Sequence, residues 1–166
     1  MELINEPTNE FNKNDFFKCL CQHGKPINIK CVEVSEITKS KINNKPTIYL
    51  NMEILNQFDI IKKDANDKEI IINPLNQIVN LPYGLQETRQ DNIYKVSNKS
   101  NLYELLNHAL KENELIPENN TKGFNISLPE IQDNLIGIVF NVVSILETDT
   151  NYKPYYKLRV INENEI

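Results

Sequence analysis

The stretch IYLNMEI at residues 48–54 has the clearest secondary-structure pattern in the chain. Apolar side chains alternate with polar or amphipathic ones: Ile48, Leu50, Met52 and Ile54 on one parity, Tyr49, Asn51 and Glu53 on the other. Successive side chains of a β-strand point to opposite faces, so this period of two predicts a strand over 47–55. One face of that strand is expected to be buried.

The segment before this strand predicts a longer strand with an irregularity in its middle. Apolar residues keep one parity as far as residue 31 and take the opposite parity after it: Ile27, Ile29 and Cys31, then Val32 and Val34. A strand whose inward face switches halfway needs a bulge or a sharp bend. We therefore expect a long, bent first strand at 27–37.

After the second strand, the pattern predicts a hairpin and then an irregular segment. The hairpin covers 58–73, with apolar strand cores at 60–61 and 70–72 and a polar turn at 64–68. The segment 74–92 contains two prolines and a glycine. It is expected to be irregular, apart from a short strand at 77–81.

One main helix is expected at 101–113. Apolar side chains recur there at the spacing of a single buried helical stripe: Leu102, Leu105, Leu106, Ala109 and Leu110. Ser100 is one candidate for the N-cap. Asn101 is the other, and it would place Glu104 three residues later, as in a capping box.

Three further strands are expected after this helix, at 124–128, 136–146 and 155–161, with one helical turn at 129–135. The segment 136–146 is apolar on both parities, which predicts a central strand covered on both faces. The last strand alternates, with Tyr156, Leu158 and Val160 on the inward parity and Tyr155, Lys157 and Arg159 on the outward one.

These elements predict an α+β or mainly β protein, because strands, one main helix and more strands follow each other without βαβ repetition. Two parts are expected. Residues 1–24 form an N-terminal arm with a short helix, in which Asp15 is the cap, Phe16, Phe17 and Leu20 are the apolar side and Gly24 is the end. Residues 25–166 form a single β-rich domain.

Charge and composition exclude few functions. The 166 residues carry a net charge of −5, which argues mildly against nucleic acid, although a local basic stripe acts within a Debye length of about 8 Å. No stretch approaches the roughly 20 apolar residues of a membrane helix, so no membrane partner is expected. The polar, acidic start and the odd number of cysteines indicate a protein of the reducing cytoplasm.

Four soft metal ligands lie within thirteen residues: Cys19, Cys21, His23 and Cys31. Their spacing departs from that of structural zinc sites, so we expect free thiols and no metal, with zinc and a redox thiol as alternatives. His108 is expected at the boundary of the helix stripe rather than in a catalytic role. No catalytic motif and no cofactor motif is present, which predicts a protein that is not an enzyme; carboxylates that converge only in the fold are the alternative.

Two short segments combine the residue types that single-stranded nucleic acid prefers. Lysines 39, 41 and 45 lie in the link between the first two strands, at 38–46, which contains no acidic residue. Rings and cations interleave near the C-terminus: Tyr152, Lys153, Tyr155, Tyr156, Lys157 and Arg159. Cations neutralise phosphates and bases stack on rings, so these residues are candidate contacts. A solvated strand face is the alternative.

The order of elements resembles the oligonucleotide/oligosaccharide-binding (OB) fold. The resemblance rests on the bent strand at 27–37, the basic loop at 38–46, the regular strand at 47–55 and the helix before the final strands. It implies a partly open β-barrel that binds ligands on its second and third strands and on the first-second and fourth-fifth loops. Carried over, it points to Lys39, Lys41, Lys45, Tyr49 and Asn51, and to 152–155. The expected function is a non-catalytic module that binds single-stranded DNA or RNA; the alternative is a protein-interaction module or a structural subunit of a larger assembly.

Overall fold

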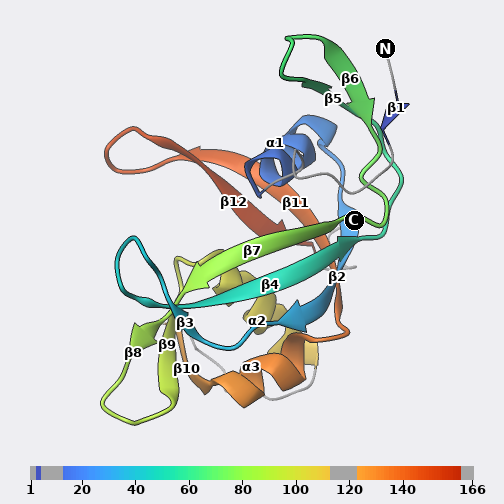
Figure 1. The fold of residues 1–166 in the computed structure, drawn as a ribbon. Coiled ribbons are helices and arrows are strands. Elements are labelled where there is room, and N and C mark those ends of the chain that lie inside the picture. The colour runs from blue at the N-terminus through green and yellow to red at the C-terminus, as the bar shows by residue number, and fades with distance from the viewer. Residues whose placement is uncertain (1–2, 5–12, 113–122, 162–166) are drawn as a thin grey trace.

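The computed structural model describes residues 3–4, 13–112 and 123–161. In these residues the chain is mostly β-structure with three helices, which confirms the predicted α+β class. The main sheet (Figure 1) contains β2 (Ile27–Val34), β3 (Thr38–Lys39), β4 (Pro46–Ile54), β7 (Ile78–Gly84), β11 (Val139–Thr148) and β12 (Pro154–Val160).

The five long strands of this sheet are all antiparallel and follow the order β7–β4–β2–β11–β12. Within it, β11, β2, β4 and β7 have the fourth–first–second–third order of a Greek key. The outer strands are β7 and β12, and no ladder joins them in the described part of the chain. The barrel expected from the sequence is therefore not closed by strand pairing among these residues.

The predicted bulge is confirmed. The pairing of β2 with β4 shifts register between Cys31 and Glu33. Because of this shift, Cys31 and Val34 are both buried although their parities differ. The alternation along β4 is also confirmed, since its apolar side chains from Ile48 to Ile54 are fully buried.

Three helices cover the inner face of the sheet. Helix α1 (Lys13–His23) packs against β7, β11 and β12, and Gly24 follows it in the left-handed region at φ 70°. Helix α2 (Asn101–Glu112) packs against β12 and α3 (Leu128–Leu135). The Ser100 hydroxyl accepts a hydrogen bond from the Leu102 amide at 3.1 Å, so Ser100 caps α2. The capping box predicted with Asn101 is wrong.

Two smaller sheets flank the main one. The predicted hairpin is confirmed as β5 (Ile60–Lys63) and β6 (Glu69–Ile72), with β1 (Leu3–Ile4) added in parallel. The second small sheet consists of β8 (Gln86–Glu87), β9 (Ile93–Ser97) and β10 (Gly123–Ser127).

Three details of the prediction are wrong. The short strand expected at 77–81 within the irregular segment 74–92 is longer than predicted, because β7 runs from Ile78 to Gly84 through Pro82 as an outer strand, where proline is tolerated. Strand β10 joins β9 rather than the main sheet. Strand β11 is covered on one face only, since Val139 is 46% exposed and the following outward residues are half-buried.

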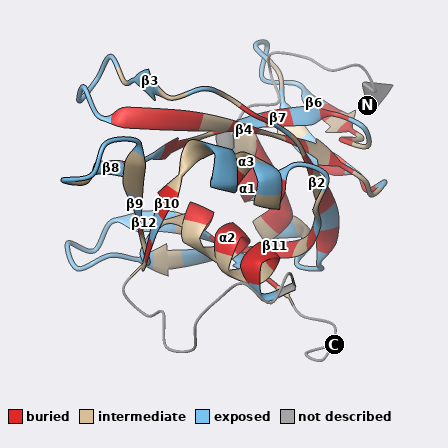
Figure 2. Ribbon diagram, turned by 90° about the horizontal axis from the view of Figure 1, so that it is seen from below, coloured by how far each residue is buried: buried red, intermediate tan, exposed pale blue. Residues whose placement is uncertain are grey.

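One hydrophobic core joins the sheet, the three helices and both small sheets. Phe16, Phe17 and Leu20 of α1 lie in the same core as the strands, so this helix is packed into the fold. Most of the expected arm (1–2 and 5–12), the residues beyond 112 expected to end the helix, and residues 162–166 lie outside the described residues. Figure 2 shows buried residues along β4 and the helices, and exposed loops beside β3, β8 and β12.

Candidate binding cavity and its surroundings

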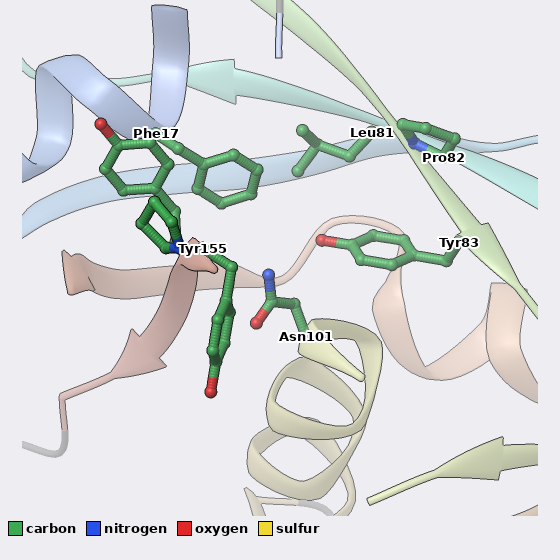
Figure 3. A pocket seen from close by; sticks show the side chains of 8 residues that line it. Phe17, Leu81, Pro82, Tyr83, Asn101 and Tyr155 are labelled. Carbon is green, nitrogen blue, oxygen red and sulfur yellow. The ribbon is translucent and has the colours of Figure 1, made fainter. Parts of the chain in front are cut away.

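A cavity of about 420 Å³ lies between the two outer strands of the main sheet. Strand β7 forms one wall, the start of β12 forms the other, and α1 and the first residue of α2 complete it (Figure 3). Its lining residues are Phe17, Leu81, Pro82, Tyr83, Asn101, Pro154, Tyr155 and Tyr156. The cavity thus lies between β7 and β12, which do not pair with each other in the described part of the chain.

Aromatic rings dominate one side of the cavity. Phe17 of α1 and Tyr156 of β12 stack with ring centroids 6.4 Å apart and an interplanar angle of 8°. The ring of Tyr155 has the opposite parity on β12 to that of Tyr156, also lines the cavity and is 44% exposed. Its hydroxyl donates a hydrogen bond to Glu147 on β11 at 2.8 Å, and this bond raises the pKa of Tyr155.

Two polar groups face the same space. Tyr83 is 8% exposed, and its hydroxyl is buried without a hydrogen-bond partner among the described residues. Burial holds the pKa of Tyr83 well above its usual range, so the hydroxyl stays protonated. The side-chain oxygen of Asn101 accepts a hydrogen bond from the Leu158 amide at 3.0 Å, which leaves its amide nitrogen toward the cavity (Figure 3).

The turn that leads into β12 presents one fully exposed ring. Tyr152 is 88% exposed and has a φ of 59°, a conformation that costs a residue with a side chain about 1–2 kcal/mol. Asp149 holds the turn, because its carboxylate accepts hydrogen bonds from the amides of Asn151 and Lys153 at 2.8 and 2.9 Å. The ring of Tyr152 and the exposed Lys153 therefore stand on an ordered turn.

The basic loop forms a second ordered turn near the end of β7. The Ser40 amide bonds the Lys45 carbonyl at 2.9 Å, and Asn44 takes the left-handed conformation. The side chains of lysines 39, 41 and 45 are all exposed. The Leu85 amide bonds the Pro46 carbonyl at 2.8 Å, which places this loop beside the last residues of β7.

The two β4 candidates lie on the outer face of the sheet and are half-buried. Tyr49 pairs in register with Pro82, so it is one strand away from the cavity. Asn51 is held in a polar ladder: its amide donates to Glu33 at 2.9 Å and its oxygen accepts from Asn80 at 2.8 Å. That ladder gives Asn51 a structural role.

The remaining two candidates lie further along β12. Lys157 and Arg159 are exposed and face outward as predicted, opposite Ile145 and Val143 of β11. Neither lines the cavity. Of the ten predicted residues, Tyr155 lines the cavity, and Tyr152 and Lys153 directly precede the lining residue Pro154 in the sequence. Tyr49 lies one strand away from the cavity. The structure does not gather all ten predicted residues in one patch.

The four soft ligands occupy separate environments. Cys19 and Cys31 are buried, and the Cys31 thiol donates to the Glu33 carbonyl at 3.8 Å. The ring of His23 packs on Phe58 at 4.7 Å. Among residues 13–112 and 123–161, no three His, Cys, Asp or Glu side chains gather as a metal would require. His108 of α2 is half-buried and contacts Phe140 at 5.6 Å, a boundary position.

Five lining residues were not predicted as contacts from the sequence: Phe17, Leu81, Pro82, Tyr83 and Asn101. The alternation of Val79, Leu81 and Tyr83 was a usable signal, since it places a hydroxyl on a buried parity. Pro82 within this alternation and Pro74 before it obscured the pattern. No described helix is long and apolar enough to cross a membrane. Comparisons with protein-family models, curated proteins and solved structures gave no match.

Proposed function

We propose that this chain is a non-catalytic binding module of the OB type that takes single-stranded nucleic acid. The observation that carries the proposal is the ring-lined cavity between the third and fifth long strands of a Greek-key sheet. The OB family is a five-stranded Greek-key barrel that is only partly open. Here α2 lies between the third and fourth long strands, and the outer strands face each other across the cavity.

The exposed residues around the cavity favour an extended nucleic-acid strand over a compact small molecule as the ligand. The β11–β12 turn and the basic loop lie at the same end of the molecule (Figures 1 and 2). The first presents Tyr152 and Lys153, and the second presents three lysines. Between them, Gly84 of β7 pairs with Thr47 of β4, beside the basic loop. A nucleic-acid strand that follows this surface meets cations at both ends and aromatic rings in the middle.

The test is fluorescence anisotropy with labelled single-stranded DNA and RNA at increasing salt. Binding is expected at low salt and weakens with a log–log slope of about −0.7 per phosphate contacted. Duplex DNA of equal length is the control, because stacking requires unpaired bases. No binding of either single strand at low salt would overturn the proposal.

A protein partner is the second candidate function, and exposed apolar side chains favour it. Ile42 is 96% exposed at the tip of the basic loop. Ile78 and Val139 are 52% and 46% exposed on the outer face of the sheet. Light scattering of the purified chain and co-purification from its host test this candidate. A monomer that retains no partner argues against it.

A further inference from the structure

The cavity between β7 and β12 has a lining that suits a planar ring. Its volume of about 420 Å³ falls in the range of roughly 300–1,000 Å³ usual for small-molecule sites. Phe17, Tyr155 and Tyr156 supply ring faces, while Pro82 and Pro154 supply flat apolar walls. None of the eight described lining residues is charged, so the cavity favours an uncharged group.

The hydroxyl of Tyr83 is the group that points to a ligand. It is buried, lacks a hydrogen-bond partner among the described residues, and points toward the cavity (Figure 3). A buried donor without an acceptor costs folding free energy that a phenylalanine at this position would not. A ligand that carries an acceptor would remove that cost on binding.

Asn101 adds a second donor to the same space. Its oxygen is committed to the Leu158 amide, so the group that remains toward the cavity is the amide nitrogen. Two donors from opposite walls, one on β7 and one on α2, match a ring with two carbonyl acceptors. Thymine and uracil present two carbonyl oxygens on a flat, uncharged ring.

We propose that this cavity receives one thymine- or uracil-type base, with Tyr83 and Asn101 donating to its carbonyl oxygens and the aromatic rings packing on its faces. The proposal rests on the proposed function in one respect, namely that the base belongs to a bound strand. A free nucleoside carries the same ring. The sugar and phosphate stay outside, where Lys153 directly precedes the lining residue Pro154.

The variant Tyr83→Phe tests the proposal because it removes the hydroxyl and keeps the ring. Tyr94→Phe is the matched control, since Tyr94 is a half-buried tyrosine on β9, outside the cavity. Oligothymidylate binding is measured by anisotropy, with free thymidine as competitor. Tyr83→Phe is expected to weaken binding roughly threefold to tenfold, whereas Tyr94→Phe stays within about twofold. Equal affinities of wild type and Tyr83→Phe would overturn the proposal.

Thymidine distinguishes the two sources of the base. Competition by free thymidine shows that the cavity holds the base by itself; a loss of strand affinity in Tyr83→Phe without such competition shows that the strand delivers it. If the wild type binds no strand, the proposed function fails. The cavity proposal then stands only if thymidine binds and Tyr83→Phe weakens that binding.

The thermal midpoint of the ligand-free protein is a second readout. Tyr83→Phe is expected to leave it unchanged or to raise it, because the variant loses a buried hydroxyl that has no hydrogen-bond partner in the described part of the chain. A midpoint several degrees lower would show that the hydroxyl has a structural partner, and it would overturn the proposal.

Discussion

The side-chain oxygen of Asn101 accepts a hydrogen bond from the backbone amide of Leu158 at 3.0 Å. This bond joins the first residue of α2 to the outer edge of β12, the side on which no described strand pairs with it. Leu158 itself is fully buried. The same side chain therefore supports the fold through its oxygen and faces the cavity through its nitrogen.

Asn101→Ala is expected to lower the free energy of unfolding by about 1–2 kcal/mol, because it leaves the Leu158 amide without an acceptor. Asn101→Asp keeps an acceptor at the start of a helix, where negative charge is favourable, and is expected to stay within about 0.5 kcal/mol of wild type. Urea denaturation measures both. Equal losses in the two variants would show that the amide nitrogen, not the oxygen, stabilises the fold.

Gly123 cannot carry a side chain. It has a φ of 112°, and a Cβ atom at this position would lie 2.2 Å from the Val96 carbonyl oxygen of the paired strand. Gly123→Ala is expected to lower the free energy of unfolding by about 3 kcal/mol, through backbone strain and separation of β9 from β10. Chemical denaturation measures it. Gly84→Ala is the control, because no atom of the described residues beyond its own chain neighbours lies within 4 Å of its Cβ position; a similar loss there would contradict the explanation.

Local side-chain patterns were sufficient to predict most strands and two helices. Each of these patterns lies within a single strand or helix: the alternation of 48–54, the parity switch after Cys31 and the leucine stripe of α2. The pairing of strands depends on contacts between distant segments. The sequence therefore did not reveal that β10 leaves the main sheet or that β7 becomes an outer strand.

The candidate site was predicted less well than the fold, for the same reason. Exposed cations and rings are visible in a sequence, and Tyr152, Lys153 and Tyr155 were found that way. The cavity needs residues from α1, β7, α2 and β12, which only the tertiary structure brings together. From the sequence, Tyr83 resembles an ordinary core residue; only the structure shows that its buried hydroxyl has no partner among residues 13–112 and 123–161.

Substitution of Tyr152 is expected to weaken nucleic-acid binding without changing the stability of the fold. Its ring is 88% exposed and its backbone is left-handed, so Tyr152→Gly relieves strain while it adds flexibility to the unfolded chain. The free energy of unfolding is expected to change by less than about 0.5 kcal/mol, since these effects offset each other. Strand affinity is expected to fall by about 1 kcal/mol or more, because one base loses its stacking partner. Denaturation and anisotropy measure the two effects.

Asp149→Ala, unlike Tyr152→Gly, is expected to destabilise the fold. It removes the acceptor of two turn amides and is expected to cost about 1–2 kcal/mol of stability. A loss of more than 1 kcal/mol in Tyr152→Gly itself would instead show that the tyrosine ring packs on the fold.

The buried thiols make the fold sensitive to alkali. Burial raises the pKa of Cys31 from 9.0 to about 11, and that of Cys19 to about 12. Above pH 9 the unfolded chain loses these protons before the folded chain does, so the free energy of unfolding is expected to fall as the pH rises from 9 toward 11. Denaturation at pH 8, 9 and 10 measures the slope. Cys31→Ala, although less stable at every pH, is expected to show a shallower slope; an unchanged slope would contradict this assignment.

The basic loop is expected to contribute to strand binding through charge alone. Replacement of lysines 39, 41 and 45 together by glutamine removes three exposed cations from one ordered turn. The magnitude of the log–log salt slope is expected to fall by about 2 if all three contact phosphates. The matched control replaces Lys95, Lys99 and Lys111, three exposed lysines on β9, before α2 and within α2. Because both triple variants change the net charge equally, an equal fall in slope would show that overall charge, and not the loop, attracts the strand.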